Sequence, residues 1–333
     1  MSATAAAGDE DAGERWRRLR RRIGPWAPVI VLVLLCLLIG LANDRFFSFG
    51  NLSRIADAAS IPLVLGLGVT FIIVMGSIDL SVEGVLAFSA VIVSLLVLNG
   101  ANGNDFGLLG VLAVLGIGAA MGFVNGVIHV GLRIPSFMAT LGMWFVGVGM
   151  GNAILGGIQV RVNDEMIRAL SLERLFGFKY QVWVALLALG IAYVIQRYTR
   201  LGRYIFAIGG GEDLAELTGI KVRAVRVITF TIAGVFYGLG GVMAVAQQGS
   251  AFALIGNDRL FTTVTAVVVG GTALMGGSGG VLNTLVGALI VVVLANGMVL
   301  MGISPYVQQI VQGGLIVVAV ALSVDRIRAR IVK

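Results

Sequence analysis

Apolar segments long enough to cross a membrane recur along the whole chain, and they limit the folds open to it. Of the 333 residues, 58% are hydrophobic and 12% are charged, about half the charged share of a soluble domain. So little charge cannot cover a soluble globule, which excludes a soluble enzyme, a nucleic-acid-binding protein and a disordered chain. At about 20 residues per span, we predict ten membrane helices. They are Trp26–Ala42, Arg54–Val74, Gly84–Leu98, Leu108–Val130, Phe137–Leu155, Val182–Ile195, Val225–Ala246, Leu260–Leu274, Val281–Met301 and Val307–Ser323.

The basic residues predict how these spans are oriented. With the N-terminus in the cytoplasm, 17 of the 24 Lys and Arg residues fall in cytoplasmic segments, as the positive-inside rule requires. The bias favours an even number of spans, so we expect an all-α polytopic bundle of about ten transmembrane helices with both ends inside. Residues 1–25 are interpreted as a basic cytoplasmic tail rather than a cleaved signal. Residues 26–323 form the transmembrane domain, with a cytoplasmic loop at 197–224, and 324–333 form a second cytoplasmic tail.

The chain has few of the residues that bind metal ions, bind nucleotides or act as catalysts. Cys36 is the single cysteine and His129 the single histidine, so a multi-ligand zinc or haem site is excluded. None of the three lysines lies in a Walker A motif. No nucleophile–base constellation appears, so we expect no enzyme activity and no cofactor, and any ATP hydrolysis must belong to another chain.

Polar residues interrupt the apolar sequence between the second and third predicted spans. The segment Gly76–Gly84 carries Ser77, Asp79, Ser81 and Glu83. Ionisable groups at membrane depth are costly and usually face a cavity or a partner. The serines are candidate caps for the following helix, with Asp79 near its positive end. Asp79 is interpreted as a cap or gate element, with a proton carrier as the alternative, and Glu83 would share its face if this piece is helical.

A weak internal echo accompanies this segment. Met75–Ser77 resembles Met275–Ser278, and Gly84–Leu86 resembles Gly280–Leu282. Transporters often contain structural repeats, but apolar sequence also produces such matches by chance. An internal repeat and a chance match both stay open.

Two long polar segments lie between spans. The outer one, Gly156–Gln181, is interpreted either as a docking surface for an extracytoplasmic partner or as a solvated connector. The inner one, Arg197–Ala224, places three glycines before a short helix-compatible run that ends near Gly219. Leu214 and Leu217 share one face of that helix, which either enters a groove of a partner or lies on its own protein.

Small and polar residues also mark the spans themselves. Glycines spaced four apart at Gly118–Gly126, Gly147–Gly151 and Gly234–Gly238 predict closely packed helices. Asn125 and Thr140 either bond to neighbouring helices or line a path for a hydroxyl-rich solute. Aromatic residues there either pack or stack on a sugar. The candidates for a path or gate are Ser77, Asp79, Ser81, Asn125, Phe137, Thr140 and Thr272.

Four motifs, in order from about residue 50 to 325, resemble those of ribose/galactose-type ABC transporter permeases. Met75–Val82 looks like the family's GGIDLSVG signature, and Arg133–Gly142 is similar to its IPxFxxTLG segment. Gly202–Ile220 resembles its cytoplasmic coupling loop, and Val269–Gly277 its GGTSLxGG stretch. The chain departs from the pattern at Glu83, where the family more often has a small residue.

The resemblance implies the permease subunit of a carbohydrate importer in the bacterial inner membrane. It implies as partners a second permease subunit, identical or different, a cytoplasmic ATP-binding subunit, a periplasmic solute-binding protein and membrane lipid. It assigns Gly156–Gln181 to the binding protein and the inner segment to the ATPase. The coupling residues are then Gly202, Arg203, Glu212, Asp213, Leu214, Glu216, Leu217 and Gly219. The sugar or polyol is left open.

Two other classes compete with this interpretation. A proton- or sodium-coupled secondary transporter needs ionisable residues near the membrane midplane, and Asp79 and Glu83 are the only close pair. An intramembrane enzyme would need a catalytic constellation that the sequence lacks.

Overall fold

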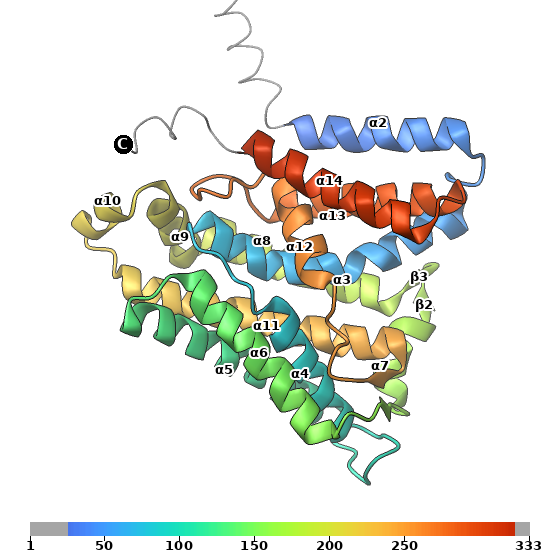
Figure 1. The fold of residues 1–333 in the computed structure, drawn as a ribbon, viewed down its shortest axis with the longest axis horizontal. Coiled ribbons are helices and arrows are strands. Elements are labelled where there is room, and N and C mark those ends of the chain that lie inside the picture. Colours follow the sequence, from blue (N-terminus) through green and yellow to red (C-terminus); the bar gives the residue numbers. More distant parts are fainter. Residues whose placement is uncertain (1–25, 324–333) are drawn as a thin grey trace, which may run out of the picture.

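Residues 26–323, the part of the chain that the computed structural model describes, fold into thirteen helices and four two-residue strands (Figure 1). The helical class predicted from the sequence is confirmed, and both tails, 1–25 and 324–333, lie outside the described residues. The helices that coincide with predicted spans are α2 (Ala27–Ala42), α3 (Phe49–Val74), α4 (Val82–Leu96), α5 (Gly107–Leu132), α6 (Ser136–Leu155), α8 (Tyr180–Tyr198), α11 (Val222–Gln248), α12 (Arg259–Val269), α13 (Val281–Leu300) and α14 (Pro305–Ser323). The remaining elements are α7 (Glu165–Leu172), α9 (Arg200–Gly210), α10 (Glu212–Leu217), β1 (Val160–Arg161), β2 (Arg174–Leu175), β3 (Phe178–Lys179) and β4 (Ser250–Ala251).

A helix corresponds to each of the ten predicted spans, although their lengths differ. Six helices are long and apolar enough to cross a membrane: α3, α5, α6, α8, α11 and α13. Three shorter apolar helices, α2, α4 and α12, have between 10 and 17 residues. The second predicted span begins too late, because α3 already starts at Phe49. The sixth is longer than predicted and runs over the 19 residues of α8.

The centre of the bundle is formed by α3 and α11. Almost every side chain of α3 after Ala59 is buried, and α11 packs on α3, α4 and α5. A helix that is apolar on all sides needs to be surrounded in this way. In Figure 1, α2, α13 and α14 lie on one side of α3, and α4, α5 and α6 lie on the other.

Glycines allow the helix backbones to touch at two crossings. Gly118 and Gly122 of α5 face Gly234 and Phe230 of α11 so closely that a Cβ atom would collide with the opposite backbone. At the second crossing, Gly147 of α6 lies against the backbone of Gly84. The close packing predicted from the glycine spacing is confirmed at both places.

Polar elements gather at the two ends of the bundle. Helices α9 and α10 lie at one end, whereas α7, β2 and β3 lie at the opposite end (Figure 1). The latter elements belong to the segment Gly156–Gln181, in which β1 pairs with β4 of the chain after α11. Asp164 begins α7 by accepting a hydrogen bond of 2.8 Å from the amide of Ile167. The outer segment is therefore an ordered structure rather than an open loop.

Candidate functional site

An extended segment, 76–81, separates α3 from α4 and lies along α6. The amide of Ile78 donates to the hydroxyl of Ser136, and the amide of Leu80 donates to that of Thr140, each at 2.9 Å. These side-chain oxygens satisfy backbone donors that non-helical chain leaves free. Since Gly84 lies beside Gly147, eleven residues into α6, α4 begins alongside the middle of α6. The third predicted span, Gly84–Leu98, is therefore confirmed as a helix up to Leu96, whereas the chain that leads into it from Gly76 is not helical.

Asp79 lies at the centre of a buried polar cluster that holds this segment. Its Oδ1 accepts hydrogen bonds from the amide of Ser81 at 2.8 Å and from the Ser81 hydroxyl at 2.6 Å. Its Oδ2 accepts from the hydroxyl of Tyr237 at 3.1 Å, and Asn125 donates to the Ser81 hydroxyl at 2.9 Å. The cluster therefore joins the extended segment to α5 and α11, and three donors compensate for the burial of the carboxylate.

The predicted helix cap does not form. Ser81 occupies the position before α4, but its side chain makes no capping hydrogen bond, because its hydroxyl donates to the stronger acceptor, the Asp79 carboxylate. The segment around Asp79 is not helical, so the shared face expected for Asp79 and Glu83 is absent too.

Glu83 instead reaches the start of another short helix, α12. After β4, the chain turns through residues 252–258, and α12 begins at Arg259. The carboxylate of Glu83 accepts a hydrogen bond of 2.9 Å from the amide of Leu260, and the Glu83 backbone contacts Gly256. A side chain from the start of α4 thus caps the start of α12.

The two segments of the internal echo follow the C-terminal ends of α3 and α12, and they contact each other there. The amide of Gly277 donates to the carbonyl of Val74 at 2.8 Å, and Gly276 lies against Gly76. Thr272 belongs to this second loop, where its hydroxyl accepts from the amide of Gly280 at 3.3 Å. It therefore lies apart from the Asp79 cluster.

The segment 197–224 is largely helical, in contrast to the predicted glycine-rich loop. Gly209 and Gly210 lie inside α9, because the apolar side chains of Ile205 and Ile208 on one face of that helix are buried. Gly209 packs directly on Val74 and Gly277. Helix α9 therefore touches the place where the two echo segments meet.

Helix α10 projects from this end of the bundle. Leu214 is 70% exposed and Leu217 is 84% exposed, whereas Ala215 is buried. Glu212 and Arg226 of α11 form an ion pair of 2.6 Å, and the chain turns away at Gly219 with φ +82°. The two leucines therefore do not lie on their own protein.

The remaining candidates lie in different surroundings. Gly202 is buried against α8 next to the Thr199 cap of α9, while Arg203 is exposed. Ser77 is buried, and Phe137 is partly exposed on α6. Asp213 and Glu216 are exposed on α10 beside the leucines.

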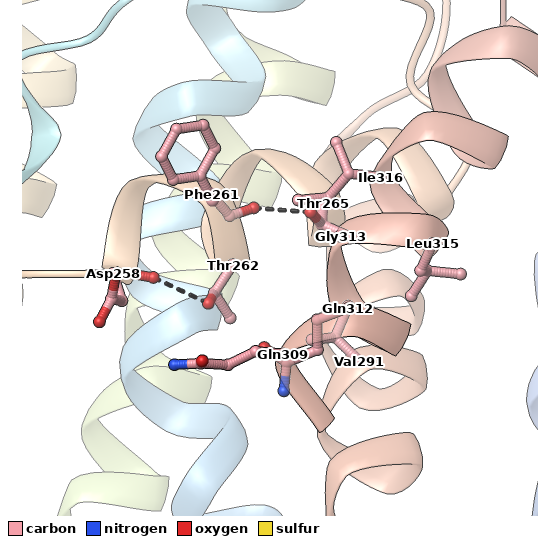
Figure 2. A pocket seen from close by; sticks show the side chains of 10 residues that line it. All are labelled: Asp258, Phe261, Thr262, Thr265, Val291, Gln309, Gln312, Gly313, Leu315 and Ile316. Carbon is pink, nitrogen blue, oxygen red and sulfur yellow. Dashed lines mark hydrogen bonds between the residues drawn. The ribbon is translucent and has the colours of Figure 1, made fainter. Parts of the chain in front are cut away.

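A cavity of about 400 Å³ between α12, α13 and α14, with a mainly apolar lining and a few polar side chains, was not predicted. Figure 2 shows Thr262 and Thr265 on α12 across from Gln309 and Gln312 on α14. The signal was present in the sequence, since both pairs are polar residues spaced three apart within apolar spans. Tyr237 and Ser136, which hold the extended segment, were also missed.

Comparison with known proteins identifies the family. The profile of the branched-chain amino acid transport system permease component matches residues 51–320. The chain belongs to this permease family. It is therefore a multi-pass inner-membrane protein, consistent with its six long apolar helices. No solved structure matches the permease.

Characterised relatives of this permease carry the names of sugar importers. The ribose import permease protein RbsC of Escherichia coli K12 is 34% identical over 267 residues, which cover 79% of the chain and 82% of the relative. The fructose import permease protein FrcC of Rhizobium meliloti is 31% identical over 278 residues, covering 79% and 75%. The galactose/methyl galactoside import permease protein MglC of Salmonella typhimurium is 32% identical over 277 residues, covering 79% and 82%.

Proposed function

We propose that this permease is the membrane-spanning subunit of an ABC importer that moves a monosaccharide or related polyol into the cell. The observation that carries the proposal is the similarity, over about four fifths of the chain, to permeases named for ribose, fructose and galactose import. The sugar is delivered by a periplasmic binding protein, and a separate cytoplasmic subunit hydrolyses ATP.

The proposed topology has ten spans with both ends in the cytoplasm. The separation of α9 and α10 from α7, β2 and β3 supports it, because the basic residues place the first pair inside and the others outside. Helix α4, with 15 residues, and helix α12, with 11, are shorter than a full span, and non-helical chain completes both spans. Such chain is tolerated in a membrane where protein satisfies its backbone, as Ser136 and Thr140 do here.

We propose α10 as the contact for the ATP-binding subunit. Two neighbouring leucines that are mostly exposed at the polar end of a bundle are suited to fill a groove of a partner. The acidic residues Glu212, Asp213 and Glu216 surround them. Movement of α10 reaches the bundle through α9, which contacts Val74 and Gly277.

We propose the ordered segment Gly156–Gln181 as the contact for the binding protein. Through the pairing of β1 with β4, it is linked to the chain that leads into α12. The Asp79 cluster and the contact between Glu83 and Leu260 would then hold the gate, with a second permease subunit completing the path.

The test is reconstitution in proteoliposomes of this permease with its ATP-binding subunit and its binding protein. We expect uptake of labelled ribose, fructose or galactose that requires ATP and the binding protein. Uptake driven by a proton or sodium gradient without ATP would overturn the proposal in favour of a secondary transporter. ATP-dependent uptake of leucine but of no sugar would show that the solute class is wrong.

A further inference from the structure

The cavity between α12 and α14 presents hydrogen-bonding groups on two helices that are mainly apolar. Gln309 and Gln312 lie about 6 to 11 Å along α14 from its start, and Thr262 and Thr265 lie opposite them (Figure 2). Asp258 and Phe261 lie at the start of α12 and line the same space. The cavity is thus built mainly from the faces of α12 and α14, with Val291 of α13 and the turn residue Asp258 completing it.

The face of α14 that carries Gln309 and Gln312 is unsuited to contact with lipid. A carboxamide in contact with hydrocarbon loses its hydrogen bonds to water without compensation. Elsewhere α14 exposes apolar side chains, including Ile310 and Val317, which suit lipid or an apolar partner. One stripe of α14 is therefore suited to an apolar environment, and the stripe with Gln309 and Gln312 to water or a polar ligand.

The free hydrogen-bonding capacity in the cavity matches hydroxyl groups. Thr262 donates to the carbonyl of Asp258 at 2.9 Å and Thr265 to that of Phe261 at 2.6 Å, so both hydroxyls keep lone pairs for accepting further bonds. Among residues 26–323, no protein group is hydrogen-bonded to the amides of Gln309 and Gln312. An amide offers donors and an acceptor together, as a sugar hydroxyl does.

The rest of the lining disfavours solutes that carry a carboxylate or another negative charge. Asp258 is the single charged residue among those that line the cavity, so a zwitterion would find a partner for its ammonium group but none for its carboxylate. Phe261 is 63% exposed and offers a ring face to the C–H groups of a pyranose or furanose. Pockets that combine an apolar wall with a few polar groups are typical ligand sites.

We infer that this cavity is the part of the translocation path that binds the solute, an uncharged monosaccharide, through Gln309, Gln312, Thr262 and Thr265, with Phe261 stacking on it. The inference rests on the proposed importer function and assigns its path to residues other than the buried Asp79 cluster.

The first test measures coupling in the complete transporter. The double variant Gln309→Leu/Gln312→Leu should lower ATP-dependent uptake of labelled ribose, fructose or galactose by about tenfold, since two hydrogen bonds to the solute are lost. ATP hydrolysis stimulated by the loaded binding protein should stay within about twofold of the unmodified protein, because the ATPase contact is remote. The matched control is Gln308→Leu, the same change on the same helix at a residue that does not line the cavity.

The second test measures directly whether water and the solute reach the cavity. In a Cys36→Ala background, Gln309→Cys and Gln312→Cys should react with a water-soluble methanethiosulfonate reagent during turnover, and an excess of the transported sugar should slow the reaction. Ile310→Cys, on the apolar stripe, should react at least about tenfold more slowly.

The two tests separate the inference from the proposed function. If the unmodified transporter takes up sugar but the double variant does so equally well, or neither cysteine reacts, the inference is overturned and the importer function stands. If the unmodified transporter takes up no sugar with ATP and the binding protein present, the proposed function fails and the inference fails with it.

Discussion

The carboxylate of Glu83, in the first turn of α4, accepts a hydrogen bond of 2.9 Å from the amide of Leu260, in the first turn of α12. Two short helices from distant parts of the chain therefore begin face to face inside the bundle. Each helix start carries partial positive charge, and one buried carboxylate lies between them. Loss of Glu83 would leave the Leu260 amide without this acceptor. It would also leave the partial positive charges of the two helix starts facing each other with no negative charge between them.

Two different replacements of Glu83 should therefore distinguish the effect of its hydrogen bond to Leu260 from the effect of its negative charge. Glu83→Ala removes the acceptor from the buried amide of Leu260, at a cost of about 1 to 3 kcal/mol, and should lower the melting temperature of the purified permease in detergent. Glu83→Gln keeps an acceptor oxygen and should lower it less. The control is Glu173→Ala at an exposed position, and equal melting temperatures for Glu83→Ala and this control would contradict the role of Glu83.

The hydrogen bond between Tyr237 and Asp79 should show energetic coupling. Tyr237→Phe removes one donor, and Asp79→Ala leaves the hydroxyls of Ser81 and Tyr237 without their acceptor. Contacting residues in one network deviate from additivity by about 0.5 to 3 kcal/mol. A double-mutant cycle from thermal denaturation should give a coupling in this range, and additive effects would show that the two side chains act independently.

The glycine crossing between α5 and α11 should not accept a larger side chain. Gly118→Val places methyl groups against the backbone of Gly234, and overpacking of this kind costs about 1 to 3 kcal/mol or more. We expect little folded protein by size-exclusion chromatography. Gly116→Val, on the same helix but with no atom close to its Cβ position, should purify normally. Equal yields for both variants would contradict the observed crossing.

The exposed leucines of α10 should be needed for ATPase binding but not for folding. Leu214→Ser/Leu217→Ser removes the apolar face without touching the bundle, so the melting temperature should stay unchanged. Binding of the ATP-binding subunit should weaken by about tenfold or more, because apolar anchors dominate such interfaces. Leu172→Ser, an equally exposed position at the opposite end, is the control. Unchanged binding by the double variant would remove α10 from the proposed interface.

Most of the features that the sequence did not predict depend on contacts between residues that are far apart in the chain. The helices and the close-packed glycines follow from local composition and spacing, so the positions of the helices were predicted within about five residues. The break before α4 was located from Asp79 and its serines, but the cap by Ser81 was wrong because a carboxylate two residues away is the stronger acceptor. Tyr237 and Leu260 are 158 and 177 residues from their partners, and no local pattern reports such a contact. The cavity was missed because the sequence does not show that the polar pair on α12 and the polar pair on α14 face each other.

The junction of Gly76, Gly209, Gly276 and Gly277 is a contact of main chain on main chain. Side chains normally absorb small displacements by changing rotamer, but these four residues have none. No side chain at this junction can absorb a shift of α9, even one of an ångström. Such a shift must therefore move both echo segments at the same time. Because it has no side chains, this junction is a stiff link between α9 and the two echo segments. A movement of α10 would be transmitted through this stiffness rather than through any chemical group.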